Sequence, residues 1–162
     1  MNNLSKRRKF SMPSLWGCAC IFIVIGCNKD KGTTDEATVS EVGSGIVVIQ
    51  AYSYPAESGS VGVAYVSIAN AGPGDDRLLS VKSPVCQKVE MHDTINEEGV
   101  MKMKHQDFGF AIAAGKELVM KPGGSHLMLL GTKAPVVGGQ AFKMTLNFEK
   151  ADALEIEVQV NQ

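Results

Sequence analysis

A strict alternation of apolar and polar residues near the carboxyl end constrains the fold of this chain more than any other feature. The alternation has two runs separated by a polar break, with apolar residues at every second position: Phe142, Met144, Leu146 and Phe148, then Leu154, Ile156, Val158 and Val160. Because successive side chains of a β-strand point to opposite faces, each run predicts a strand with one buried and one exposed face. We therefore predict a β-hairpin that turns near residues 150–153.

The preceding part of the chain predicts further strands. Residues 46–54 and 61–68 are rich in β-branched and aromatic side chains, and shorter runs at 78–81 and 86–92 predict two more strands after a glycine- and proline-containing loop. Helical periodicity is absent from these runs. The sequence therefore predicts an all-β sandwich or barrel in one domain that begins near residue 45.

The amino-terminal residues have the pattern of an export signal. Basic residues at 6–9 precede an apolar stretch that ends in Val24-Ile25-Gly26-Cys27, which resembles the lipobox of bacterial lipoproteins. We expect a signal peptide at residues 1–26, a lipid on Cys27, a polar flexible tether over 27–44, and the folded domain at 45–162. The protein is then an exported, membrane-anchored lipoprotein of the cell envelope that faces the periplasm or the outer surface. The basic residues leave both the general and the twin-arginine export routes open.

Charge and cysteine usage limit the possible partners. All four basic residues of the first 26 positions lie at 6–9, so the remainder carries 12 basic and 17 acidic residues. A mildly acidic domain without a basic cluster argues against nucleic acid as a partner and favours a cation. Cys18 and Cys20 leave with the signal peptide, so Cys86 is the free thiol of the lipidated chain and no internal disulfide forms. We expect Cys86 to be a small buried residue, and a role as an added sulfur ligand stays open.

Histidine and methionine cluster in one window of the chain. The three histidines are His92, His105 and His126, and five of the eight methionines lie in or beside the same window: Met91, Met101, Met103, Met120 and Met128. Thioether sulfur is a soft, neutral donor that selects Cu(I), and imidazole suits copper in either oxidation state. Because methionine forms no disulfide, a methionine and histidine site suits copper outside the cytoplasm.

Strand geometry indicates which of these side chains converge. Residues two apart on a strand share a face, so His126 and Met128 can bind one ion while the leucines beside them pack inward. By the same alternation Met91 belongs to the core and His92 is accessible, whereas Met101, Met103 and His105 point the same way. We expect Met120 and Met144 to fill the core. His105 is either an auxiliary ligand or a solvated loop histidine.

The ordered spacing of these residues resembles the PCu(A)C periplasmic copper chaperones. Their motif is His, ten residues, Met, about twenty-one residues, His, one residue, Met. Here ten residues separate His92 from Met103, one separates His126 from Met128, and the middle gap of 22 is one residue longer. We expect the extra residue in the loop at 104–116, where added length costs little.

The resemblance implies a fold, a ligand set and a function. It implies a cupredoxin-like or immunoglobulin-like β-sandwich with His92, Met103, His126 and Met128 as ligands of one copper ion, expected as Cu(I), and no enzymatic activity. The implied recipient is the binuclear copper centre of a terminal oxidase, with thiol-based copper assembly proteins as further partners. We expect a monomer held at the membrane by its lipid anchor.

Three other functions are alternatives to the copper chaperone. A blue-copper electron carrier needs two histidines and a cysteine around the metal, yet no histidine precedes Cys86. A zinc hydrolase using the three histidines would leave the ordered methionines unexplained. The third alternative is a structural surface lipoprotein in which the cluster has no metal role.

Overall fold

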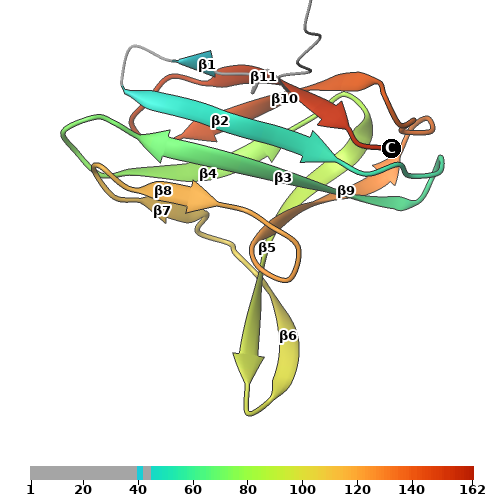
Figure 1. The fold of residues 1–162 in the computed structure, drawn as a ribbon, viewed down its shortest axis with the longest axis horizontal. Helices are drawn as coiled ribbons and strands as arrows, with labels where there is room; N and C mark the ends of the chain where they lie inside the picture. Colours follow the sequence, from blue (N-terminus) through green and yellow to red (C-terminus); the bar gives the residue numbers. More distant parts are fainter. Residues whose placement is uncertain (1–39, 42–44) are drawn as a thin grey trace, which may run out of the picture. The chain divides into compact units, whose positions relative to one another are not determined.

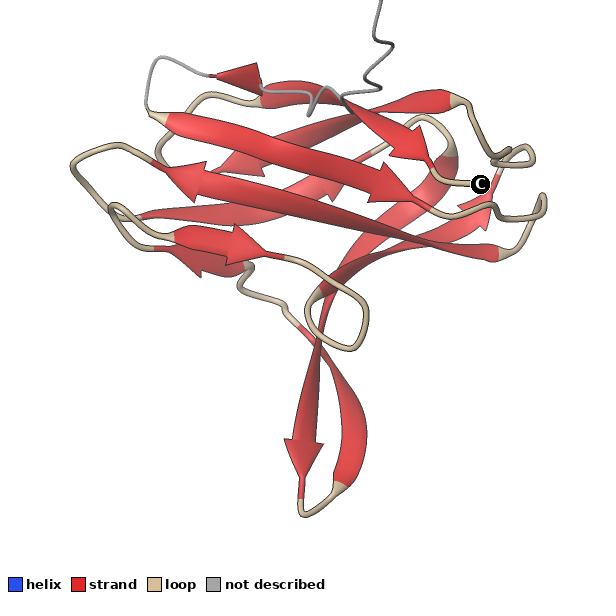
Figure 2. Cartoon of the chain, viewed as in Figure 1, coloured by secondary structure: helices blue, strands red, loops and turns tan. Residues whose placement is uncertain are grey.

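The computed structural model describes residues 40–41 and 45–162, and in these residues the chain forms eleven β-strands and no helix (Figure 1 and Figure 2). The strands are β1 (Ser40–Glu41), β2 (Ile46–Ser53), β3 (Val61–Asn70), β4 (Asp76–Lys82), β5 (Cys86–Glu97), β6 (Val100–His105), β7 (Phe110–Ile112), β8 (Glu117–Val119), β9 (His126–Thr132), β10 (Ala141–Phe148) and β11 (Leu154–Val160). The predicted all-β class is confirmed. None of the described residues forms a helix long and apolar enough to cross a bilayer.

Hydrogen bonds connect the strands into a sheet that folds over one apolar core. The strand order is β6-β5-β9-β3-β2-β11-β10-β4-β7, with β1 beside β2 and β8 beside β3. A short parallel contact between β2 and β11 joins the two halves of the sandwich. Strands from both halves contribute fully buried side chains to the core, among them Ala64, Ile68, Leu127, Leu129, Leu78, Met144, Leu146 and Val158.

The carboxyl-terminal hairpin agrees with its prediction. Strands β10 and β11 pair antiparallel from residues 141 and 159 to residues 146 and 154. The apolar residues of the two alternating runs point inward, and the turn between the strands occupies residues 149–153. The core also contains Cys86, Met91, Met120 and Met144, as expected from the sequence.

Strand β5 is longer than predicted and forms a projecting hairpin with β6. Its pairing with β9 ends at His92, so the later residues of β5 pair with β6 alone, and the hairpin extends away from the sandwich (Figure 1). The turn at Glu98 and Gly99 has φ of 53° and 85°, as a two-residue hairpin turn with left-handed residues requires. The side-chain oxygen of Asn96 accepts the N–H of Gly99 at 2.8 Å and closes the turn.

The prediction of a loop over residues 104–116 was only partly right. Strand β6 continues through His105, and β7 lies inside the same segment and pairs with β4. Phe110 and Ile112 are buried on either side of the exposed Ala111. This short alternating run is the last strand of the sheet and pairs with β4. An alternation of three residues is too short to identify a strand from sequence.

The predictions for the amino terminus fall on residues that the structure does not describe. The signal peptide at 1–26, the lipidated Cys27 and most of the tether at 27–44 lie outside the described residues. Within the tether, Ser40 and Glu41 pair with Val48 and Val47 as the short strand β1. The folded unit therefore makes contact with the carboxyl-terminal end of the expected tether.

A buried carboxylate fixes the start of β4 against the turn between β10 and β11. Asp76 Oδ1 accepts the backbone N–H groups of Arg77 at 2.7 Å and Lys150 at 3.0 Å, and Oδ2 accepts that of Ala151 at 3.0 Å. Burial acts to raise the pKa of Asp76, but the surrounding backbone donors outweigh it and lower the pKa below its usual value. The charged form is therefore part of the folded structure.

We expect Asp76→Ala to lower the free energy of unfolding by about 3 kcal/mol, because it leaves buried N–H groups without an acceptor. Since the folded-state pKa is depressed, this contribution is present above the ordinary pKa of 3.8 and disappears as the pH falls through the folded-state value. Urea denaturation at a series of pH values measures both effects. The exposed carboxylate of Asp152 is the control, and Asp152→Ala is expected to change stability by less than about 0.5 kcal/mol. Equal effects of the two substitutions at neutral pH would contradict the role assigned to Asp76.

Candidate metal centre

The strand register aligns the three histidines across three neighbouring strands. His92 on β5 is the Cα partner of His126 on β9 and of His105 on β6. Directly paired residues share a face of the sheet, and the ring centroid of His92 lies 5.8 Å from that of His126 and 5.1 Å from that of His105. The three imidazoles therefore form a row on the outer face, opposite the buried leucines of β9.

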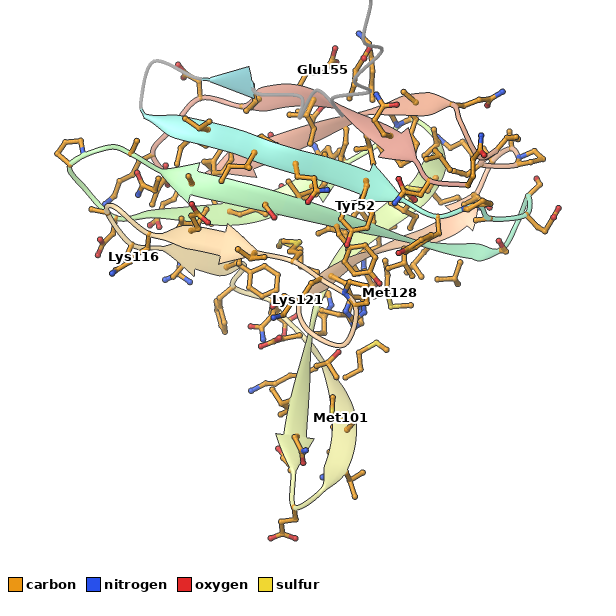
Figure 3. All side chains as sticks on the ribbon, in the orientation of Figure 1. Tyr52, Met101, Lys116, Lys121, Met128 and Glu155 are labelled. Atoms are coloured by element: carbon orange, nitrogen blue, oxygen red, sulfur yellow. The ribbon has the colours of Figure 1, made fainter. Side chains whose placement is uncertain are left out.

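The two predicted methionine ligands lie on either side of this row and on the same face. Met128 is two residues beyond His126 on β9 and is half-buried, whereas Met103 precedes His105 on β6 and is 58% exposed. Met101 pairs with Asn96, two residues beyond the partner of Met103, and therefore lies farther out on the hairpin. Figure 3 labels Met101 on the hairpin and Met128 next to the sandwich. The structure thus brings His92 and His126 together directly, places Met128 next to them, and presents Met103 on the adjoining hairpin.

A tight turn before β9 fixes the orientation of His126. Lys121 N–H donates to Ser125 O, Gly124 N–H donates to Lys121 O, and Gly123 adopts the left-handed φ of 76° that this reversal requires. The carbonyl oxygen of Gly124 lies 2.9 Å from His126 Nδ1. Because a carbonyl only accepts, Nδ1 carries the proton, and Nε2 of His126 is the nitrogen with a free lone pair.

The same carbonyl ties the turn to the neighbouring strand. Thr94 Oγ1 on β5 donates to Gly124 O at 3.1 Å, and Ser125 Oγ donates to Asp93 Oδ1 at 2.9 Å. These bonds hold the turn against the base of the hairpin. The imidazole of His126 is therefore positioned by neighbours on β5, as metal-binding histidines generally are by their surroundings.

His92 has one nitrogen bound to a carboxylate and the other without a partner. Its Nε2 lies 3.1 Å from Glu90 Oε2. Because the carboxylate oxygen can only accept a hydrogen bond, the imidazole proton lies on Nε2. Its Nδ1 is buried and has no hydrogen-bond partner among the described residues. An unpaired buried lone pair costs free energy, and a metal ion would satisfy it. The donor chemistry of the site therefore fits a soft or borderline metal ion.

Glu90 is the member of this cluster that the sequence did not identify as functional. Its Oε2 lies 3.9 Å from His105 Nδ1, and its Oε1 accepts Lys88 Nζ at 2.7 Å. Hydrogen bonds from Lys88 and His92 lower the pKa of Glu90, so the carboxylate is charged at neutral pH. The shared face of Glu90 and His92 was visible in the sequence, but the approach of His105 depends on the cross-strand register.

His105 and Cys86 had been left undecided by the sequence. His105 belongs to a strand rather than a loop, its side chain is 40% exposed, and its Nε2 lies 3.3 Å from Asp107 Oδ1. Cys86 is buried at the start of β5, six residues before His92 and roughly 20 Å from it at the rise of an extended strand. Burial raises the pKa of the Cys86 thiol, so it stays protonated and takes no part in the histidine row.

Two tyrosines border the candidate site. Tyr52 and Tyr65 are Cα partners on β2 and β3, and their rings stack at 5.1 Å. Tyr65 is two residues beyond Val63, the Cα partner of Met128, so it shares the outer face with that methionine. Burial, reinforced by the neighbouring phenol groups, raises the pKa of Tyr52 and of Tyr65. Protonated aromatic rings therefore cover the flank of the site on β2 and β3.

Comparison with known sequences finds relatives over most of the chain. The profile of the family described as putative lipoprotein LpqE-like matches residues 46–160. A putative lipoprotein of Leifsonia xyli subsp. xyli is 32% identical over 123 residues, which are 76% of this chain and 74% of that protein. An uncharacterized protein of Rickettsia prowazekii is 30% identical over 96 residues, which are 59% of this chain and 53% of that protein.

Comparison with solved structures finds the same sandwich. The copper-bound PCuAC domain from PmoF2 superimposes with a TM-score of 0.64 at 27% identity, over 76% of this chain and 97% of that domain. The apo form of the same domain gives 0.62 at 29% identity, over 76% and 94%. CuI-DR1885 from Deinococcus radiodurans gives 0.52 at 23% identity, over 68% and 76%, and supports the fold alone. The predicted cupredoxin-like sandwich and the predicted resemblance to PCu(A)C proteins are both confirmed.

We expect the metal-free protein to hold His126 as the Nδ1–H tautomer and His92 as the Nε2–H tautomer, because each proton faces an oxygen acceptor. Long-range ¹H–¹⁵N correlation spectra of the imidazole rings, recorded at about pH 8 where an ordinary histidine is neutral, distinguish the two forms. Replacing the acceptor in Glu90→Gln is expected to alter the His92 spectrum and leave that of His126 unchanged. Identical tautomers at the two positions would contradict the assignment.

Proposed function

The chain belongs to the family of LpqE-like putative lipoproteins and has the fold of PCuAC domains, and we propose on this basis that it is a copper chaperone that binds Cu(I) and passes it to a partner. The proposed ligands are Nε2 of His126, a ring nitrogen of His92, and the thioether sulfurs of Met103 and Met128. The observation that carries the proposal is the register that places His92 beside His126, with a thioether on each side of the pair.

The donor set suits an ion that must be bound and then released. Two imidazoles and two thioethers are neutral, so the bound ion keeps its single positive charge, which is tolerable at a surface and costly in a core. Met103 is mostly exposed on the projecting hairpin, whereas His126 is buried beside its turn. We infer that a recipient displaces the thioether of Met103 first and that the imidazole of His126 leaves last.

The relatives support copper as the cargo. The PCuAC domain from PmoF2 has been solved with copper bound, and 76% of this chain superimposes on it at 27% identity. Each side chain of the proposed ligand set has a role in binding the ion, and none of them requires a catalytic role. We propose that the protein is not an enzyme.

We propose that the protein acts at the membrane surface of the cell envelope. The lipid on Cys27 and the tether at 27–44 would keep the domain close to a membrane partner and raise its effective concentration there. The proposed recipient is the binuclear copper centre of a terminal oxidase, reached directly or through a thiol-based copper assembly protein. The family description as a lipoprotein supports the anchor.

An electron-transfer or structural lipoprotein is the alternative function. Blue copper requires a cysteine thiolate next to two imidazoles. Cys86, the free cysteine of the described residues, is buried at the far end of β5 from the histidine row. This separation favours the chaperone over the electron carrier.

We expect the double substitution Met103→Leu and Met128→Leu to weaken Cu(I) binding by at least about a hundredfold, because leucine keeps the apolar volume and removes both sulfur donors. Competition with a chromophoric Cu(I) chelator under reducing conditions measures the affinity, and X-ray absorption at the copper edge reports sulfur coordination.

Met101→Leu is the matched control for this experiment. Met101 is 56% exposed on the same hairpin, close to the 58% of Met103, and lies one step farther from the histidines. The control is expected to keep its Cu(I) affinity within about threefold. An affinity that the double substitution leaves unchanged would rule out the proposed ligand set.

We expect Cys27→Ser to abolish fatty-acid labelling of the protein in bacterial cells, because the thioether-linked lipid needs the cysteine sulfur. Metabolic labelling with an alkyne fatty acid, followed by mass spectrometry of the mature amino terminus, measures the modification. Cys20→Ser is the control and is expected to keep the label, since Cys20 belongs to the proposed signal peptide. Labelling that survives Cys27→Ser would contradict the anchor.

A further inference from the structure

A carboxylate and two imidazoles converge on a second donor set beside the proposed Cu(I) ligands. One ligand atom each from Glu90, His92 and His105 lies within 4.8 Å of the other two. Glu90 Oε2 lies 3.1 Å from His92 Nε2 and 3.9 Å from His105 Nδ1. Neither Met103 nor Met128 is part of this set, so its chemistry differs from that of the proposed Cu(I) site.

The fold holds these three groups in place from several directions. Glu90 and His92 share a face of β5, and the pairing of β5 with β6 places His105 opposite His92. Lys88 Nζ occupies Oε1 of Glu90 and leaves Oε2 directed to the imidazoles. Asp107 lies beside Nε2 of His105, which leaves Nδ1 of that ring facing Glu90.

The side chains are also partly shielded from water. The side chain of Glu90 is 22% exposed and that of His92 is 14% exposed. A charged carboxylate that is removed from water to this extent needs compensating positive charge. The ammonium group of Lys88 provides positive charge at Oε1 of Glu90. A divalent cation between Oε2 and the two imidazoles would provide positive charge at the second carboxylate oxygen.

We propose that Glu90, His92 and His105 form a binding site for divalent copper. Carboxylate oxygen and imidazole nitrogen are harder donors than thioether sulfur, and among divalent first-row ions such a set binds Cu(II) most strongly. The carboxylate also neutralises one of the two charges of the ion. The domain thus carries a hard donor set for Cu(II) next to a soft donor set for Cu(I).

The two sets share His92, and this makes their occupation exclusive. A neutral imidazole has one nitrogen with a lone pair and one with a proton. When His92 binds Cu(II) through Nε2, together with Glu90 and His105, its proton lies on Nδ1. When it binds Cu(I) through Nδ1, its proton lies on Nε2. His92 therefore serves one ion at a time. The exclusivity rests on the proposed Cu(I) function, whereas the site at Glu90 does not.

Titration of the purified protein with Cu(II), followed by electron paramagnetic resonance at neutral pH, tests the site. We expect one bound Cu(II) with nitrogen and oxygen ligands. Glu90→Gln and His105→Asn are each expected to lower the Cu(II) affinity by at least about tenfold, and His105→Asn is expected to change the Cu(I) affinity by less than about threefold. Cu(II) affinities that both variants leave unchanged would overturn the site.

Two control variants separate loss of a ligand from loss of charge or fold. Glu97→Gln removes an exposed carboxylate of the same strand, paired with Lys102, and is expected to leave Cu(II) binding unchanged. Lys88→Met removes the ammonium partner of Glu90 but keeps the carboxylate, and is expected to retain or strengthen Cu(II) binding. A loss of Cu(II) affinity in Glu97→Gln as large as that in Glu90→Gln would mean that net charge, and not the three ligands, governs the binding, and would overturn the site.

Preloading with Ag(I), a soft monovalent ion that does not reduce Cu(II), tests the exclusivity. One equivalent of Ag(I) is expected to abolish the signal of protein-bound Cu(II), and simultaneous binding of both ions would refute the sharing of His92.

Failure of the proposed Cu(I) function and failure of the Cu(II) site give different results. If Met103→Leu with Met128→Leu leaves Cu(I) binding intact, the proposed function fails while the Cu(II) results stand. If Glu90→Gln and His105→Asn leave Cu(II) binding intact, the inference fails while the Cu(I) site stands.

Discussion

The register between β9, β5 and β6 is the constraint on which the site depends. His92 is a direct cross-strand partner of both other histidines. A shift of the β5–β9 pairing by one residue would turn a row of side chains into the core, and a shift of the β5–β6 pairing would move His105 to the opposite face of the hairpin. Two turns fix that register. The turn before β9 is closed by backbone hydrogen bonds, and the turn between β5 and β6 accommodates two residues with positive φ.

The same alternation that builds the core also builds the candidate metal site. Along β9 the leucines at 127 and 129 are buried, while His126 and Met128 belong to the opposite face. The packing of the two leucines fixes the position of β9 in the sandwich. The strand in turn positions His126 and Met128, and neither of these candidate ligands has to pack in the core. The donors that come from β6 lack this support, because every residue of that strand is exposed. The site thus combines a rigid half on β9 and β5 with a more accessible half on the hairpin.

Local patterns predicted much of this structure, and the remainder depended on contacts between distant residues. Period-two alternation predicted the β10–β11 hairpin, the inward leucines of β9, the buried Met91 and the shared face of Met101, Met103 and His105. Nothing in the sequence revealed that His92 pairs with His126 and His105 at once, since pairing across strands is not a local property. Glu90 was overlooked for the same reason, because its role depends on His105. Strand β7 could not be predicted because three alternating residues are too few to identify a strand. The stacking of Tyr52 on Tyr65 could not be predicted because it depends on the register between β2 and β3.

Strand β6 ends the hydrogen-bonded order of the sheet, so one side of its backbone has no neighbouring strand among the described residues. Exposed strands of this kind tend to associate edge to edge and aggregate unless charges oppose it. Lys102 and Lys104 alternate with Met101 and Met103 along β6 and are exposed. Two copies meeting along this strand would bring their ammonium groups together. The repulsion between these lysines therefore opposes the association of two copies along the methionine-bearing strand, and it keeps the thioethers of Met101 and Met103 exposed.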